Sequence, residues 1–254
     1  MTLLATYDWS LVWENRHAFL DGLATALKVS AVALVLSVAV GLLLALARMS
    51  KPPLSWAAAI YINVFRGVPA LVSVIWVYFG WSLLLGISFS VFQAGVIALV
   101  LLYGAFIAEI YRAALEAIPR GQREAGLAVG MHPIRVFAQI ILPQATKIAI
   151  PNIGSMFIGM VKDTSTFTVI GLLEVVRVTQ NLNSTTFQPF VLYTAAAGVY
   201  VVAAFVLDFL FRAVEKSLAT PPVGPMGRAV AGRRTRRIEA VMQRVEAVSG
   251  ARGA

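Results

Sequence analysis

Two ionisable residues, Arg66 and Asp163, lie next to long apolar stretches and could contact a charged solute. If a helix begins near Leu54, Arg66 lies roughly 15–18 Å along it. An arginine inside an apolar layer needs an opposite charge or water, and Asp163 is the candidate partner. A guanidinium group binds a carboxylate bidentately, so we expect Arg66 to attract the carboxylate of a zwitterion and Asp163 its ammonium group. A purely structural ion pair that fixes helix packing is the alternative.

Four further side chains near Asp163 complete this candidate substrate path. Thr164 and Ser165 follow Asp163 directly and offer hydroxyl groups. Ser155 and Met156 precede it by about two helical turns and are expected to shape the pocket for the rest of the solute. A packing role is the alternative for Ser155, because no nucleophile motif surrounds it.

The elements that must position these residues are membrane spans. Hydrophobic residues make up 59% of the chain and charged residues 13%, against about 25% charged in soluble proteins. The net charge of +9 comes from Lys and Arg that gather in a few loops and in the C-terminal tail. This distribution is typical of the cytoplasmic segments of a membrane protein, and we expect no nucleic-acid partner. The N-terminus has no basic segment before an apolar core, so no cleaved signal peptide is expected.

Enzyme chemistry is not predicted. The sequence contains no cysteine and only two histidines, His17 and His132. It has no phosphate-cradling G-x-x-x-x-G-K-[ST] loop, no G-x-S-x-G and no H-E-x-x-H. We therefore expect no catalytic residue, no metal site and no cofactor.

Five spans are expected, the first at 29–47 and the last at 189–207. The charge-free run 67–108 is too long for one span and fits two, with a turn at 81–90. Basic residues cluster after the first span, around 112–147 and in the tail. The positive-inside rule places these segments in the cytoplasm, the N-terminus outside and the C-terminus inside.

The fourth apolar run, 148–161, is short. As a helix it covers about 21 Å, less than the roughly 30 Å of a hydrocarbon core. Apolar residues resume at 167–173, after Lys162 and Asp163. Either this charged pair lies at the outer interface before a loop that dips back, or the span is interrupted and the pair lines a cavity at depth. Interrupted spans are typical of transport sites, which favours the second interpretation.

A polar, amphipathic segment separates the third and fourth spans. Pro119 suits the first turn of a short helix, and Gly130 with Pro133 suits its end. The small residues Ala125 and Gly126 permit close approach to a facing surface. A solvated loop helix is the alternative.

Several ordered motifs resemble those of one transporter family. Glu124-Ala125, with Gly130 six residues after the glutamate and Leu142-Pro143 further on, resembles the EAA loop of binding-protein-dependent ABC importer permeases. Residues 61–69 (YINVFRGVP), 104–112 (GAFIAEIYR), 118–125 (IPRGQREA), 142–145 (LPQA) and 162–165 (KDTS) resemble segments of the polar amino acid group, which includes permeases for histidine, glutamate, glutamine and arginine. The resemblance covers about residues 20–215. The chain departs from the pattern at Val68, Gly126 and Thr166.

The resemblance implies an all-α integral membrane protein with five transmembrane helices of the type I importer permease fold and a cytoplasmic coupling helix. It implies a multi-pass subunit of the bacterial cytoplasmic (inner) membrane that translocates polar amino acids or close derivatives. The residues implied to couple it to an ATPase are Gly121, Gln122, Arg123, Glu124, Ala125, Gly126 and Gly130.

The partners implied are two copies of a separate ABC ATPase subunit, an extracytoplasmic solute-binding protein and membrane lipid. The permease would pair with itself as a homodimer or with a related permease as a heterodimer. An ion or small-solute channel not coupled to an ATPase is the alternative function. It could use Arg66 and Asp163 for selectivity and would not need the EAA-like loop.

Three regions follow from this interpretation. Residues 1–19 form an extracytoplasmic N-terminal segment, 20–218 form the permease domain with its coupling loop at about 112–145, and 219–254 form a cytoplasmic basic tail. Within the tail, 233–248 is either a basic amphipathic helix held by anionic lipid or a poorly ordered end.

Overall fold

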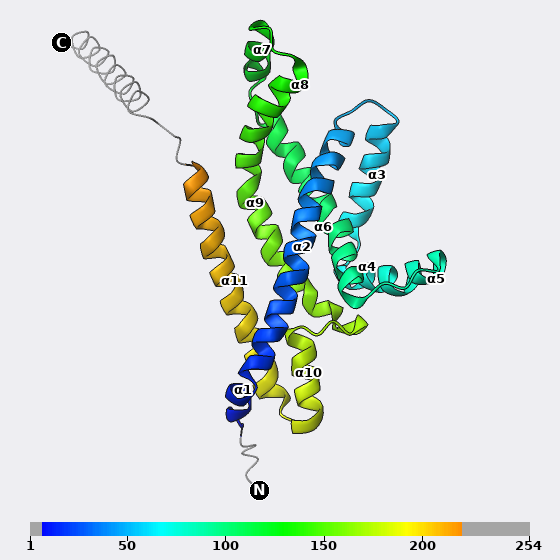
Figure 1. Ribbon diagram of the computed structural model, residues 1–254, viewed down its shortest axis with the longest axis vertical. Helices are drawn as coiled ribbons and strands as arrows, with labels where there is room; N and C mark the ends of the chain where they lie inside the picture. Colours follow the sequence, from blue (N-terminus) through cyan, green and yellow to red (C-terminus); the bar gives the residue numbers. More distant parts are fainter. Residues whose placement is uncertain (1–6, 220–254) are drawn as a thin grey trace, which may run out of the picture. The chain divides into compact units, whose positions relative to one another are not determined.

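The computed structural model describes residues 7–219, and this part of the chain is helical and contains no strand (Figure 1). The chain divides into a unit Met1–Ala213 and a unit Val214–Ala254, and only residues 214–219 of the second are described. The predicted tail therefore lies almost wholly outside the described residues. The helices are α1 (Ser10–Glu14), α2 (Arg16–Arg48), α3 (Leu54–Gly67), α4 (Ala70–Ile75), the π-helix η1 (Trp76–Trp81), α5 (Ser82–Leu85), α6 (Val91–Glu116), α7 (Arg120–Ala128), α8 (Pro133–Val136), the π-helix η2 (Phe137–Ile141), α9 (Leu142–Asp163), the 3-10 helix η3 (Thr164–Ile170), α10 (Val175–Thr186) and α11 (Pro189–Ala219).

Three of these helices are long and apolar enough to cross a membrane alone: α2, α6 and the Pro189–Lys216 part of α11. Two further pairs of helical segments, each bent at a short break, are long and apolar enough when taken together. Leu54–Gly67 is bent by 108° against Ala70–Leu85, and Pro133–Ile170 by 46° against Val175–Thr186. Counting each bent pair as one span gives five, the number predicted from the sequence.

The second span is not a continuous helix. Val68 is extended (φ −92°, ψ 129°), and Pro69 follows with φ −63° and ψ 147°. Proline has no N–H to donate and disfavours the helical conformation of the residue before it, so α3 ends at Gly67. This break was not predicted, because it lies inside the charge-free run 67–108, where only the turn at 81–90 was expected. The break places Arg66 in the last turn of α3.

The expected turn between the second and third spans is present and shorter than predicted. Gly86 has φ +67° after α5, a conformation that favours glycine. Ser90 then caps α6: its hydroxyl accepts from the Gln93 N–H, and the Gln93 side chain accepts from the Ser90 N–H.

Helix α6 packs against α2, α3, α4 and α9. Small residues permit close approach between these helices, as is common in membranes. A Cβ on Gly41 of α2 would lie 2.7 Å from Cγ2 of Ile107, and one on Gly159 of α9 would lie 2.8 Å from the hydroxyl of Tyr103. The first contact sets the approach of α2 to α6, and the second sets the approach of α9 to α6 beside Tyr103.

Helix α2 begins well before the expected first span. Its N-terminal part packs through Phe19 on Val175 and Leu192 at the end of the molecule that carries α1 and α10 (Figure 1). The fully buried Glu174 caps α10 there by accepting from the N–H groups of Val176 and Arg177.

Candidate functional site

A cavity of about 390 Å³ lies between α3, α6 and α9. Four polar or flexible side chains line it: Arg66 from α3, Glu109 from α6, and Asn152 and Met156 from α9. The remaining lining residues are apolar and include the aromatic ring of Phe106. An apolar cavity with a few convergent polar groups is the usual form of a small-molecule site.

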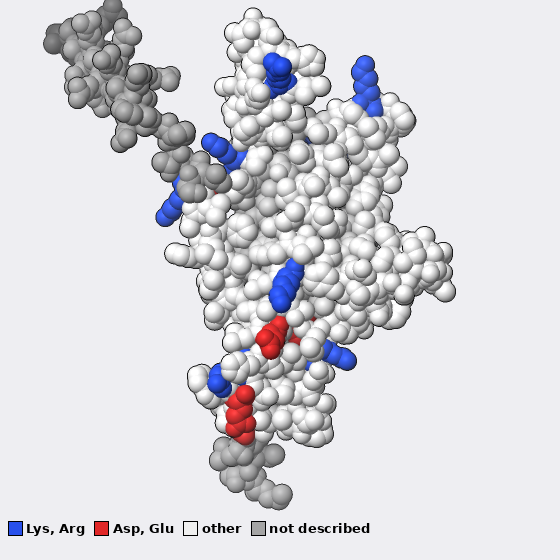
Figure 2. All heavy atoms as spheres, in the orientation of Figure 1, with Lys and Arg blue, Asp and Glu red and all other residues white. Residues whose placement is uncertain are grey.

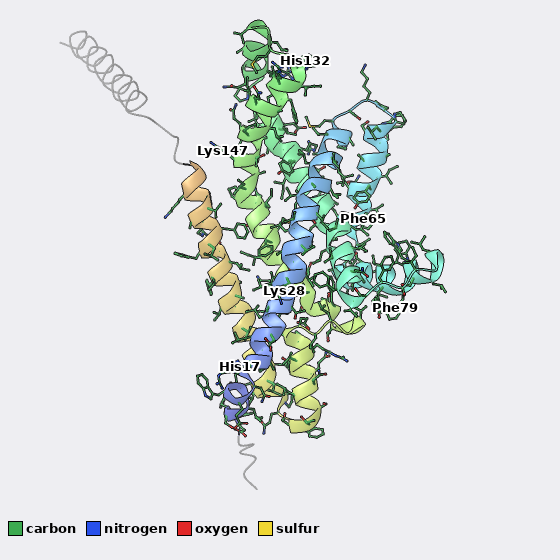
Figure 3. The ribbon with its side chains drawn as sticks, in the orientation of Figure 1. His17, Lys28, Phe65, Phe79, His132 and Lys147 are labelled. Carbon is green, nitrogen blue, oxygen red and sulfur yellow. The ribbon has the colours of Figure 1, made fainter. Side chains whose placement is uncertain are left out.

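Arg66 is exposed to this cavity at the break of the second span. Its guanidinium carbon lies 5.6 Å from the centroid of the Phe106 ring, a cation–π contact. Figure 3 labels the neighbouring Phe65 between His132, at the α7–α8 end, and His17 at the opposite end. Arg66 has no carboxylate within ion-pair distance among residues 7–219. The guanidinium group therefore has donors that a solute carboxylate could use.

Asp163 is not the partner of Arg66. It ends α9, and its Oδ2 accepts a hydrogen bond of 2.9 Å from the hydroxyl of Tyr103 on α6. Helical spacing places Asp163 on the same side of α9 as Met156, about 10 Å further along. The two predicted charges therefore border the same α6–α9 interface without meeting in one cavity.

The remaining predicted path residues are dispersed. Thr164 is fully buried and donates to the Val161 carbonyl. Ser155 is exposed and donates to the Pro151 carbonyl at 3.3 Å. Ser165 is half-buried just beyond Asp163. Only Met156 joins Arg66 in the lining of the cavity.

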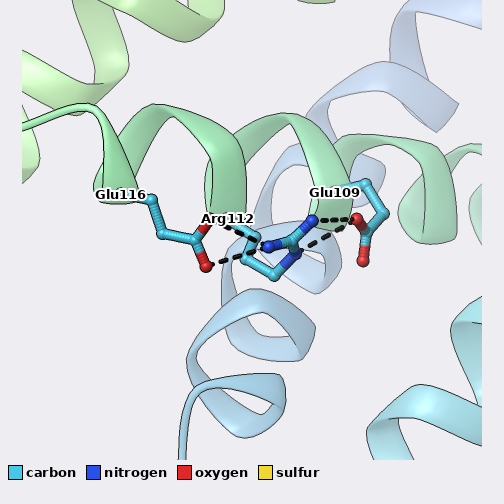
Figure 4. Close-up of polar contacts among 3 residues, drawn as sticks. All are labelled: Glu109, Arg112 and Glu116. Atoms are coloured by element: carbon cyan, nitrogen blue, oxygen red, sulfur yellow. Dashed lines mark hydrogen bonds and ion pairs between the residues drawn. The ribbon is translucent and has the colours of Figure 1, made fainter.

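Glu109 and Asn152 were missed by the sequence analysis. Glu109 belongs to a run of charges in which Arg112 lies between it and Glu116 (Figure 4), with N–O distances of 2.9 Å to each. Their three- and four-residue spacing marks one helix face and could have revealed the cluster. Asn152 lies four residues before Met156 on the same face of α9.

Helix α7 matches the short helix expected after Pro119. Gly130 has φ +79° and follows the last turn. Its N–H donates to the Leu127 carbonyl at 3.0 Å, and the Met131 N–H donates to the Gly126 carbonyl at 3.1 Å. These two bonds form a Schellman motif, which ends the helix sharply.

The predicted coupling residues divide between two faces of α7. Gly126 is buried, and a Cβ there would lie 2.9 Å from Val136 of α8. Helical periodicity puts Gly121, Glu124 and Ala125 on the opposite face, where all three are exposed. Gln122 is exposed as well, and Arg123 lines a second cavity beside α8. The facing surface that Gly126 allows α7 to approach is thus part of this chain.

Charge is distributed unevenly along the molecule. On the face shown in Figure 2, Lys and Arg lie toward the end that carries α7 and α8 without acidic neighbours, while both signs occur around α1 and α10. Between the two ends this face is largely uncharged, apart from one basic side chain near the middle of the view. This pattern, with up to five apolar spans, defines the class of an integral membrane protein.

A model of the family of binding-protein-dependent transport system inner membrane components matches residues 37–220. The chain belongs to this family.

Curated relatives cover most of the chain. The arginine transport system permease protein ArtQ of Bacillus subtilis (strain 168) is 36% identical over 212 residues, which are 83% of this chain and 97% of that protein. The glutamine transport system permease protein GlnP of Escherichia coli (strain K12) is 33% identical over 217 residues, 84% and 98% of the two chains.

Solved structures confirm the predicted fold class. A crystal structure of an amino acid ABC transporter with histidines has a TM-score of 0.76 and 33% identity, and covers 85% of this chain and 100% of that one. An inward-facing MetNI methionine ABC transporter, at 20% identity and a TM-score of 0.67 over 83% and 98% of the chains, shares the fold. The chain has the type I importer permease fold, and its family supports the importer prediction over a channel.

Proposed function

We propose that the protein is the membrane subunit of an importer for polar amino acids or close derivatives, driven by a separate ATPase. Its family, and relatives named for arginine and glutamine transport, support this proposal. The permease itself binds and conducts the solute. ATP hydrolysis belongs to two copies of the partner subunit, and an extracytoplasmic solute-binding protein delivers the substrate to a dimer of permeases.

The exposed face of α7 is the observation that carries the coupling role. Its inner face is fixed to α8 and η2 through Gly126, whereas Gly121, Glu124 and Ala125 are exposed on the other side. A short helix held rigidly on one side, with small residues around a carboxylate on the other, suits insertion into a groove of a second protein. Closure of the ATPase dimer would then move α7 together with the spans.

The same proposal sets the orientation. The α7–α8 end, rich in Lys and Arg, faces the cytoplasm of a bacterial inner membrane, and the α1–α10 end faces outward. The N-terminus is outside and the C-terminus inside.

For the substrate we assign the carboxylate of the amino acid to Arg66. Its donors face the cavity beside Phe106, and guanidinium–carboxylate bonds combine charge with directionality. The ammonium group has two acidic candidates. Glu109 lines the same cavity and is paired with Arg112, whereas Asp163 lies further along the path and is bonded to Tyr103. Sharing one cavity favours Glu109, and Asp163 remains the candidate for an outer station with Thr164 and Ser165.

Reconstitution tests the proposal. The permease would be purified with its co-encoded ATPase, placed in liposomes with ATP inside, and supplied with binding protein and labelled arginine, glutamine, glutamate or histidine. ATP-dependent uptake of at least one of them is expected. Solute-independent ion conductance by the permease alone, with no uptake, would favour the channel instead.

A further inference from the structure

A second cavity, of about 750 Å³, lies where α2 and α6 meet α7 and α8. It is separate from the substrate path, and of the predicted coupling residues only Arg123 lines it. Its floor is apolar and includes Leu46 of α2, Leu115 of α6 and Phe137 of η2. Its charged lining consists of Arg120, Arg123 and Glu116.

The charges of this cavity favour an anion. Glu116 is already paired with Arg112 at 2.9 Å. Arg120 and Arg123 have no ion pair within residues 7–219, and both are exposed. Two arginines one helical turn apart present several N–H donors to the same volume, a geometry suited to a phosphate group.

The apolar part of the cavity continues onto the outer surface of α2. Leu43 and Leu46 are spaced by three residues on α2 and are 67% and 37% exposed, and Leu46 also lines the cavity. Val35 and Leu36 extend this exposed stripe toward the middle of the span. A ligand that fills the cavity therefore has an apolar route along α2, which a soluble anion would leave unused.

We propose that an anionic phospholipid of the cytoplasmic leaflet occupies this cavity, with its phosphate between Arg120 and Arg123 and its acyl chains along α2. The proposal rests on the orientation given above, which puts the cavity, at the ends of α2 and α6, on the cytoplasmic side. Basic pockets between membrane helices on the cytoplasmic side recognise anionic headgroups through this combination of charge and apolar surface. The bound lipid would fill the gap between α7 and the spans and so brace the coupling helix.

Photo-crosslinking in nanodiscs tests the site on the assembled transporter, without ATP or substrate. A photoreactive phosphatidylglycerol should label peptides within residues 115–141, and a phosphatidylcholine probe should label them much less. Arg120→Gln combined with Arg123→Gln should lower labelling by about 30-fold. Arg120→Lys with Arg123→Lys should retain most of it. Arg135→Gln is the matched control, because Arg135 is exposed on α8 and does not line the cavity.

Three results would overturn the proposal: equal labelling by the two lipids, unchanged labelling in the double glutamine variant, or full competition by millimolar inorganic phosphate, which would indicate a soluble-anion site. If the double variant fails to assemble, the unmodified protein still tests the proposal. Labelling by the two lipids is then compared, and competition by inorganic phosphate is measured. Because labelling needs no transport, failure of the lipid site and failure of the importer function are separately visible.

Discussion

Tyr103 donates its hydroxyl hydrogen to Asp163 across the α6–α9 interface, at 2.9 Å. This bond holds the only acidic side chain of α9 against α6 and away from Arg66. It also closes the interface beside Gly159, whose missing side chain leaves room for the tyrosine hydroxyl.

Removing the donor should leave Asp163 without a partner. Tyr103→Phe is expected to cost about 1–3 kcal/mol of stability, because a half-buried carboxylate loses its bond. Adding Asp163→Leu should recover part of that loss. The measurement is the thermal melting of the purified transporter, with Tyr193→Phe, at an exposed tyrosine of α11, as the control. Equal melting of Tyr103→Phe and the control would contradict a role for the bond.

Arg66→Met should lower kcat/KM for uptake about ten-fold or more, through loss of a charge-assisted bond to the substrate carboxylate. Arg66→Lys should retain part of the activity. Uptake of labelled amino acid by proteoliposomes, with ATPase activity measured in parallel, checks assembly at the same time. Lys51→Met, in the exposed loop before α3, is the control. Wild-type uptake in Arg66→Met would remove Arg66 from the path.

Arg66 and Asp163 should act independently. A double-mutant cycle with Arg66→Met and Asp163→Leu compares the changes in stability, followed by thermal melting. The two single changes are expected to add within about 0.5 kcal/mol. A structural ion pair between them would instead make the double variant clearly more stable than the sum of the singles implies. The same cycle with Glu109→Gln and Arg112→Met serves as a positive control, because those two side chains are in contact.

Gly126→Ala should weaken coupling. The added Cβ would lie 2.9 Å from Val136, so α7 must move away from α8. Substrate-stimulated ATP hydrolysis is expected to fall more than basal hydrolysis does, and Val136→Ala in the same chain should restore part of it. Gly198→Ala is the matched control, since a Cβ there would meet no atom within 4 Å beyond the neighbouring residues and backbone of its own helix. If Val136→Ala did not restore substrate-stimulated hydrolysis although the complex still assembled, the contact between Gly126 and Val136 would not explain the loss.

The orientation can be checked in this cysteine-free chain. Ser184→Cys in α10 should react with a membrane-impermeant maleimide added outside intact cells, and Ser50→Cys should react only after lysis. Both serines are exposed. The reverse labelling pattern would invert the topology.

Local signals predicted local structure well. Pro119 and Gly130 bound α7 because their backbone preferences act within one turn, and the apolar runs gave the number of spans. The pairing of Arg66 with Asp163 was wrong because it depends on the rotation of α9, which Gly159 and Tyr103 fix through a long-range contact. The burial of Glu174 was not predicted from the sequence either. A carboxylate is tolerated there only through its hydrogen bonds to the start of α10 and to Tyr200, which depend on the folded structure.

Residues 133–163 run without a loop through α8, η2 and α9. Gly126 lets α7 pack against the first turns of this continuous helical segment. Asp163 ends the segment beside Tyr103. In the proposed orientation, a displacement of α7 would therefore be transmitted along this continuous helical segment toward the outer half of the membrane. This helical segment has two points at which it can bend. One is the wide turn of the π-helix η2, and the other is Pro151, which has no N–H to donate to the helix hydrogen bonds. Bending at these two points would let the part of the segment next to α7 move while the Tyr103 contact stays in place.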